Sequence, residues 1–511
     1  MKLSRHAYTR FWDVHAWVGV SAGLVLHVMF FAGAFALFEK ELTSWQQRGK
    51  VAAVRDAPIA AVVDRALRER GASPAQLSVS LPGKRSPHLE LYWPRKEGGA
   101  WEELRLDPVT GQTVAETSHL ATILFWLHFL YHPQAPWGMQ VAGFFGVAFL
   151  LALITGVLIH LKDLVAQLHQ FRPAKAVKVL WSDLHKVLGI VGLPFQAMVA
   201  FTGAFICLSS LLLATFSGPL FRGDEAAAAA SLWGGTAEVK AVGRPAATLD
   251  LDALIARARQ SFPQLEVQFV NLRNRGDAGA VARLWGEVPD RLFARGDLVL
   301  RGTDGAVLSE SLTTSDTPGA AVNRWVVGLH YALFGGLAAR IGYALLALGT
   351  CLTILSGNWI WLLRRERRAM SAGNRLLAKL TIGVGGGILP ATAALFWANR
   401  LAPAAARLVV ESWAFFGVWA LVAGLFLSRA EARGGWVGLL RVSGAAFAAI
   451  PLVSVAVADA HLLNAGRHGR LDVVGVELGV LLLGAGLLVG AQLVTGRSAA
   501  GPPAELVRAR A

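Results

Sequence analysis

Two stretches of the chain carry the same pattern. Residues 13–33 read DVHAWVGVSAGLVLHVMFFAG, and residues 183–203 read DLHKVLGIVGLPFQAMVAFTG. After the histidine of each stretch, His15 or His185, a small residue follows at the fourth, seventh and eighteenth positions. These offsets return to nearly one face of an α-helix at about 100° per residue. The pattern predicts two related helices, each with a histidine above a stripe of small residues that admits a close neighbour, either a helix or a flat cofactor.

The repeat continues downstream of each stretch. Leu127-His128-Phe129 and Leu329-His330-Tyr331 each precede a hydrophobic run, and Thr155-Gly156 and Ser356-Gly357 follow at offsets that differ by one residue. Agreement at several spacings indicates an internal duplication. The duplicated unit is expected to be a membrane span, an outer module and a second span, so two copies form a four-helix unit.

Composition places the chain in a membrane. Of its 511 residues, 54% are hydrophobic and 16% are charged, whereas soluble domains carry about 25% charged residues. Eight runs are apolar and long enough to cross a hydrocarbon core of about 30 Å as helices. They lie near residues 14–38, 138–160, 186–213, 338–363, 378–397, 408–428, 437–458 and 472–495. The sequence therefore predicts a polytopic α-helical membrane protein.

Basic residues indicate the orientation of the spans. The formal net charge is +15, but lysines and arginines form short clusters beside hydrophobic runs, so we expect no nucleic-acid partner. The clusters in 162–186 and 364–368 belong in the cytoplasm by the positive-inside rule. Both termini then lie in the cytoplasm, and the first run is expected to be a retained anchor helix. We predict a bacterial inner-membrane location.

Two long polar stretches then face the periplasm. The first is predicted to form a helix at 58–70 and strands at 77–81, 89–93 and 104–106. The second repeats this order, with a helix at 251–262 and strands at 267–272, 280–285 and 298–300. Both are expected to be small α+β modules. The expected organisation is a first transmembrane helix (1–40), module 1 (41–118), transmembrane helices two and three (119–214), module 2 (215–322), transmembrane helix four (323–368) and a C-terminal four-helix extension (369–511).

Four histidines occupy equivalent positions in the two copies. His15 and His185 lie near the cytoplasmic boundary, and His128 and His330 lie near the opposite boundary. One interfacial histidine is most simply a solvated or hydrogen-bonded side chain. Retention of both pairs through a duplication favours a function instead. Neutral imidazole binds haem iron, and two protein ligands leave no site open for oxygen, which suits electron transfer. Two such pairs would hold two haems on opposite sides of the bilayer.

Three further histidines have competing interpretations. His160 ends the second span and is an alternative inner ligand, although its counterpart in the duplication is Trp361. His27 lies at mid-membrane, where an intramembrane site and a hydrogen bond to a neighbouring helix are about equally expected. His132 lies in a proline-broken loop and either contacts substrate or is an ordinary surface residue. The remaining histidines, including His461, are expected to be exposed or interfacial.

The repeated histidines, with Gly335-Gly336 after His330, resemble the PepSY-associated transmembrane helix family. Asp107-Pro108-Val109-Thr110-Gly111 is similar to the turn of a PepSY module, and 301–305 is a degenerate version. The resemblance covers roughly residues 5–368. It implies haem within the four-helix unit, with His15, His128, His185 and His330 as the ligand positions. It also implies reduction of a ferric siderophore on the periplasmic side, as in the reductases of that family.

The leading hypothesis is an oxidoreductase that passes electrons from a cytoplasmic or quinol donor through two b-type haems to a periplasmic ferric-siderophore. The sequence assigns no chemistry to the four extra C-terminal spans. The alternatives are that they bind a quinone, bind a partner subunit or bind no ligand. Two other classes of function compete. One is a non-enzymatic membrane scaffold or regulator, and the other is a permease for a chelate or metal that uses His27.

Overall fold

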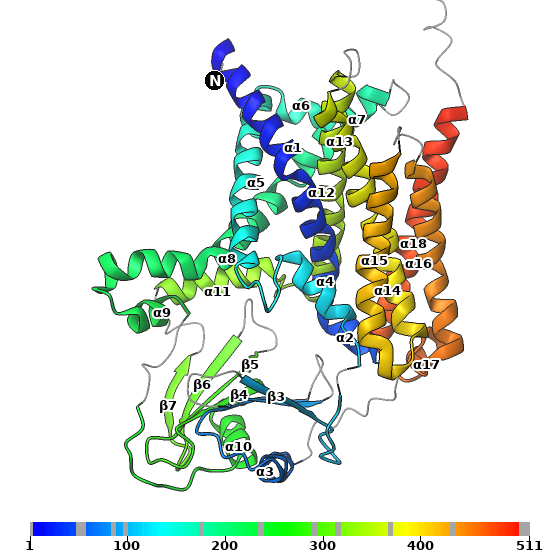
Figure 1. Cartoon of the computed structure of the whole chain (residues 1–511). Helices are drawn as coiled ribbons and strands as arrows, with labels where there is room; N and C mark the ends of the chain where they lie inside the picture. Colours follow the sequence, from blue (N-terminus) through cyan, green and yellow to red (C-terminus); the bar gives the residue numbers. More distant parts are fainter. Residues whose placement is uncertain are drawn as a thin grey trace, which may run out of the picture. The chain divides into compact units, whose positions relative to one another are not determined.

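The computed structural model describes residues 4–47, 58–82, 88–95, 101–115, 117–172, 177–233, 240–288, 295–311, 318–365, 371–429 and 435–499. The chain divides into two compact units, which are described separately. The helical unit comprises Met1–Gly49, Thr117–Leu208 and Leu337–Ala511, and the sheet unit comprises Lys50–Glu116 and Ser209–Gly336. Figure 1 labels most of the elements of both units.

Among the described residues, eight helices are long and apolar enough to cross a membrane, as the sequence predicts. They are Arg5–Ala36, Gly138–His160, Leu193–Phe221, Gly336–Arg365, Ala372–Leu401, Ala404–Ser428, Gly435–Val457 and Leu471–Thr495. The first begins earlier than predicted, because the side chain of Ser4 accepts the backbone N–H of Ala7 and caps a helix that includes the basic start of the chain.

The helical unit contains the membrane-spanning helices and several short ones. Its elements are α1 (Arg5–Ala36), α2 (Glu39–Gln46), α4 (Leu120–His128), α5 (Gly138–His160), α6 (Leu164–Leu168), α7 (Val177–Val191), α8 (Leu193–Phe221, which continues into the sheet unit), α12 (Gly336–Arg365), α13 (Ala372–Leu380), the π-helix η1 (Thr381–Gly386), α14 (Ile388–Leu401), the 3₁₀-helix η2 (Ala404–Ala406), α15 (Arg407–Ser428), α16 (Gly435–Val457), α17 (Leu462–Arg467) and α18 (Leu471–Ala499). We call the end at which α1 begins the inner end, following the predicted topology, and the opposite end the outer end.

The C-terminal helices α14, α15, α16 and α18 pack side by side (Figure 1). Their core is aromatic: Phe396, Phe415 and Phe447 are fully buried. Burying an aromatic side chain of this size removes a large apolar surface from its surroundings and gives dense packing between helices. The extension is therefore a packed part of the helical unit.

Helix breaks set the positions of the histidines. The predicted third span consists of α7 and α8, separated at Gly192, because Pro194 has no N–H to continue the hydrogen-bond ladder. The second and fourth spans are each preceded by a short helix, α4 and α11 (Pro318–His330). His128 is the last residue of α4, and His330 is the last residue of α11.

The sheet unit contains one sheet with the strand order β3-β2-β1-β4-β5-β6-β7, all pairs antiparallel. The strands are β1 (Leu77–Ser80), β2 (Leu89–Pro94), β3 (Trp101–Leu106), β4 (Glu266–Arg273), β5 (Val281–Glu287), β6 (Arg295–Arg301) and β7 (Val307–Ser311), and its helices are α3 (Ala60–Glu69), α9 (Glu225–Trp233), α10 (Leu251–Ser261) and α11. Side chains of α3 and α10 share one hydrophobic core with the strands.

The six predicted strands and two predicted helices of the polar stretches are present, but the stretches do not form separate sheets. Val79 of β1 pairs with Val270 of β4, and this contact joins the strands of both stretches into a single sheet. Both residues are buried. Strand β7 has no counterpart in the sequence prediction, because its exposed residues show no apolar alternation.

The two predicted turns have related geometry. Asp107 Oδ1 accepts the backbone N–H groups of Val109 (3.0 Å) and Thr110 (2.7 Å). The bond from Thr110, which stabilises the carboxylate, holds the pKa of Asp107 below its ordinary value. Gly111 and Gly305 close the turns with φ of 70° and 71°, a backbone conformation that glycine adopts without strain.

Candidate functional site

His15 of α1 and His185 of α7 face each other within the helical unit. Their ring centroids are 6.1 Å apart and the ring planes are inclined by 78°. The two residues are 170 positions apart in the chain and are equivalent in the duplication. The structure therefore brings together the two histidines that the sequence assigned to the inner boundary.

Each of these rings is oriented by a backbone carbonyl of a neighbouring helix. His15 Nδ1 lies 2.8 Å from the carbonyl oxygen of Ala152 in α5, and His185 Nδ1 lies 2.8 Å from that of Thr353 in α12. A carbonyl oxygen only accepts, so Nδ1 carries the proton and donates it. In the neutral imidazole the other nitrogen, Nε2, then keeps its lone pair, as in histidines that bind metals.

A glycine faces each ring. A Cβ added at Gly156 would lie 3.0 Å from Cε1 of His15, and one added at Gly357 would lie 3.2 Å from Cε1 of His185. Side-chain contacts this short are unfavourable, so both glycines leave the space that the imidazole occupies. These are the glycines of the repeated Thr155-Gly156 and Ser356-Gly357 pairs.

The two rings could hold one haem iron between them. An imidazole nitrogen lies about 2 Å from a bound transition metal, which places the centres of two opposed rings about 6 Å apart. The centroid separation of 6.1 Å is compatible with this value, and it also falls within the ordinary range for two rings in contact. Two histidines suffice for haem because the porphyrin supplies the other four ligands. In the part of the chain that is described, no group of three or more His, Cys, Asp or Glu residues is placed to hold a metal ion.

His128 repeats the same arrangement at the outer end of the helical unit. Its Nδ1 lies 2.8 Å from the carbonyl oxygen of Met29 in α1, and a Cβ added at Gly33 would lie 2.7 Å from that nitrogen. His330 belongs to the sheet unit, where its ring contacts Tyr331 with centroids 5.7 Å apart. The pairing of His128 with His330 stays a prediction from the duplication.

The other three candidate histidines differ from this arrangement. His160 Nδ1 lies 3.2 Å from the side-chain amide of Gln167 in α6 and not from a backbone carbonyl, and its role as an alternative inner ligand stays a prediction. His27 is 4% exposed, and its Nε2 lies 2.9 Å from the carbonyl oxygen of Gly385 in η1. His132 accepts the backbone N–H of Gln134 (3.3 Å) within its exposed loop.

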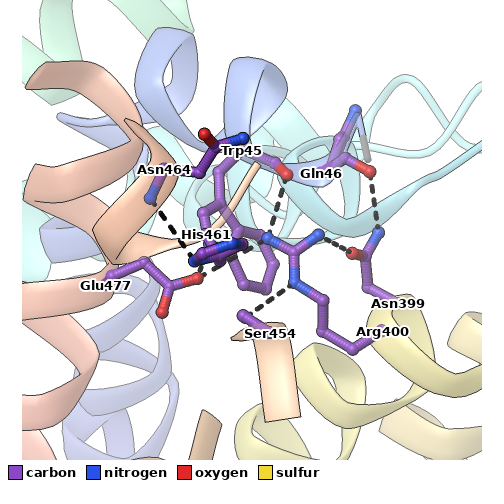
Figure 2. Close-up of polar contacts among 8 residues, drawn as sticks. All are labelled: Trp45, Gln46, Asn399, Arg400, Ser454, His461, Asn464 and Glu477. Carbon is purple, nitrogen blue, oxygen red and sulfur yellow. Dashed lines mark hydrogen bonds and ion pairs between the residues drawn. The ribbon is translucent and has the colours of Figure 1, made fainter. Parts of the chain in front are cut away.

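Figure 2 shows a buried polar cluster at the outer end that the sequence analysis missed. The guanidinium of Arg400 lies 3.4 Å from the ring centre of Trp45 and 3.7 Å from Glu477. Trp45 Nε1 donates to Glu477 Oε1 (2.6 Å), and Arg400 Nε donates to Ser454 Oγ (3.0 Å). The cluster thereby ties α2 to α14, α16 and α18. In the sequence, the charged residues of this cluster lie inside or just beyond predicted spans. When each span is considered alone, such a residue is expected at the membrane interface.

His461, which the sequence predicted to be exposed or interfacial, lies beside this cluster (Figure 2). Its Nδ1 accepts the backbone N–H of Asn464 (3.5 Å) and caps α17. A side chain that accepts an N–H of the first helical turn replaces a hydrogen bond that the helix cannot make itself. His461 therefore has a local structural role.

Comparison with known proteins gives two matches. The family model of the PepSY-associated TM region matches residues 12–364. An uncharacterised protein of Pseudomonas aeruginosa is 32% identical over 387 residues, which cover 72% of this chain and 93% of the relative. The family match includes all of the candidate histidines and both groups of strands, and it ends before α13.

Proposed function

Because this chain belongs to the family of the PepSY-associated TM region, we propose that it is a bacterial inner-membrane haem protein that carries electrons across the bilayer to a periplasmic ferric siderophore. The observation that carries the proposal is the His15–His185 pair, with its ring separation of 6.1 Å. Haem b, when bound, supplies one-electron transfer at its iron.

The residues of the chain would hold and orient two such groups, an inner and an outer haem. His15 and His185 would be the ligands of the inner haem, and the hydrogen bonds to the carbonyls of Ala152 and Thr353 would keep their Nε2 atoms available for iron. His128 and His330 are proposed as the outer ligands by their equivalence in the duplication. Two protein ligands on one haem iron would leave no coordination site open for oxygen, which would favour electron transfer over oxygen chemistry.

The electrons are proposed to come from a cytoplasmic or quinol donor, and the sheet unit is proposed to dock the chelate. Siderophores hold ferric iron with hard oxygen ligands. Ferrous iron binds such ligands less strongly, so reduction releases the metal for uptake. No side chain of the protein has to act as an acid, a base or a nucleophile.

Electron transfer across vesicles tests the proposal. Purified protein is placed in liposomes that enclose dithionite, with a ferric catecholate and a colorimetric ferrous chelator outside. Wild-type vesicles are expected to form the ferrous complex well above protein-free vesicles. His15→Ala and His185→Ala should reduce the rate to that background, whereas His169→Ala, which changes an exposed histidine, should not.

The rival functions give different outcomes. A colourless wild-type protein that forms no ferrous complex would contradict the proposal and favour the membrane scaffold. Iron entering the lumen of vesicles that hold haem-free protein would favour the permease instead. His27, the residue on which the permease hypothesis depends, already has its Nε2 engaged with Gly385.

A further inference from the structure

The short helix α4, which ends at His128, is not capped by the side chain of its N-cap residue. It has nine residues, and its N-cap residue His119 makes no side-chain cap hydrogen bond. Isolated helices shorter than about 12–15 residues are marginal, and the first four N–H groups of a helix need partners from outside it. The partners of these groups therefore decide whether α4 is held in place.

Two of those partners come from other elements of the helical unit, and the third is Ser118, which directly precedes the N-cap. Glu411 of α15 accepts the backbone N–H of His119 through Oε2 (2.6 Å). The backbone N–H of Ala121 donates to Oε1 of Gln46 in α2 (3.0 Å). Ser118 Oγ accepts the N–H of Leu120 (3.2 Å) and donates its own hydrogen to Glu411 Oε1 (2.8 Å). Three successive N–H groups at the start of α4 are satisfied in this way.

A second set of buried contacts fixes the capping groups. Asn399 of α14 donates through Nδ2 to Glu411 Oε1 (2.8 Å) and Ser118 Oγ (3.0 Å). Glu411 and Asn399 are both 0% exposed. The adjacent Arg400 donates to the backbone oxygen of Trp45 (3.2 Å), next to Gln46 (Figure 2). These buried hydrogen bonds hold the Glu411 and Ser118 side chains against the start of α4.

The other end of α4 is fixed by His128. Its hydrogen bond to Met29 and its contact with Gly33 hold the ring against α1. Between the two ends, Leu120 and Leu124 are fully buried. The orientation of the ring therefore depends on the cap from α15 as well as on α1. The equivalent helix α11 begins with Pro318, a residue that suits the first helical position because it has no N–H to satisfy.

We infer that Glu411 is a positioning residue for His128, and that the C-terminal extension, which lies beyond the family match, serves to hold the helix of the outer ligand. The inference rests on the proposed function, because it assigns Glu411 an effect on the outer haem. Glu411 contacts Ser118, His119 and Asn399, and it acts on His128 through α4.

The test compares Glu411→Ala, Glu411→Gln and Ser443→Ala in the full-length protein. Ser443 is a matched control, because it is buried in the same extension and its hydroxyl has no hydrogen-bond partner among the described residues. Two quantities are measured: amide hydrogen exchange of residues 119–121, and the midpoint potentials of the haems in an optical redox titration.

Glu411→Ala should speed exchange at the start of α4 about tenfold, the factor that corresponds to a lost cap of about 1.4 kcal/mol. It should also shift the potential of one haem and leave the other at the wild-type value. Glu411→Gln keeps an acceptor for the His119 N–H, so its exchange rate and its haem potentials should lie close to the wild-type values. Ser443→Ala should match wild type in both measurements.

Three outcomes would overturn the inference. They are unchanged exchange and potentials in Glu411→Ala, an equal shift of both haems, and the same shift in Ser443→Ala. The last two would indicate a general loss of stability. Wild-type protein that contains no haem would refute the proposed function itself, so the two failures are distinguishable.

Discussion

At the scale of single residues, His15, His128 and His185 share one arrangement. Each ring places Nδ1 at 2.8 Å from a backbone carbonyl of a neighbouring helix, and each lies against a glycine. Substituting the side chain of the residue that provides a carbonyl leaves the carbonyl in place. The fold therefore sets the tautomer of each ring, with the proton on Nδ1. Gly33 of the small-residue stripe is needed because the His128 ring occupies the space of a side chain there, and Gly156 and Gly357 of the repeated pairs leave the same space for His15 and His185.

Gly33→Ala tests this arrangement at the outer end. The added Cβ would lie 2.7 Å from Nδ1 of His128, so the ring must move and weaken its bond to Met29. We expect a loss of about 1–2 kcal/mol in unfolding free energy, with reduced absorbance of any haem held by His128. The measurement is thermal unfolding in detergent together with the visible spectrum.

Gly19→Ala is the matched control on the same helix, because a Cβ there meets nothing within 4 Å. Alanine is the better helix former, so this variant should be equal to wild type or more stable by up to about 1 kcal/mol. Equal unfolding midpoints and spectra for the two alanine variants would show that the contact between Gly33 and His128 does not matter.

At the scale of elements, the sequence predicted more than the position of the spans. Hydrophobic periodicity located α3 and α10 and the strands β1 to β6 within a few residues. It did not predict that β1 pairs with β4, because the two strands are separated by almost 190 residues and local patterns carry no information on such pairing. The sequence also did not predict the π-helix η1. Its backbone hydrogen bonds join residues five apart, but its hydrophobic residues show no pattern that differs from that of an α-helix.

The joined sheet predicts that both groups of strands unfold together. Val79 of β1 is 0% exposed and pairs with Val270 of β4. Val79→Ala removes two methyl groups from this core and should cost about 2–3 kcal/mol. Hydrogen exchange should then rise by the same factor in β2 and in β5. The exposed turn variant Val109→Ala should leave both unchanged, and a rise confined to β2 would mean that the two groups are independent.

At the scale of the whole molecule, the C-terminal extension is the part that the sequence explained least. Asn399, Arg400, Glu411 and Glu477 each lie inside or just beyond a predicted span, where a polar residue is most simply interfacial. These residues form buried contacts only when α2, α14, α15, α16 and α18 are assembled. Each side chain makes its contacts with residues of a helix or segment other than its own. Burial of such groups is costly unless they are paired, as they are here. The extension thus adds buried polar contacts that the sequence did not predict. The duplicated histidines of the same unit, in contrast, were predicted from the sequence.

The claim on which the proposed function depends is that imidazoles from α1 and α7 share one iron. Electron paramagnetic resonance of the oxidised protein, with the haem-to-protein ratio, tests it most directly. We predict two low-spin haems per chain, loss or conversion to high spin of one in both His15→Ala and His185→Ala, and no change in His169→Ala. Haem-free protein from haem-replete cells, or signals that persist unchanged in His15→Ala and His185→Ala, would contradict it.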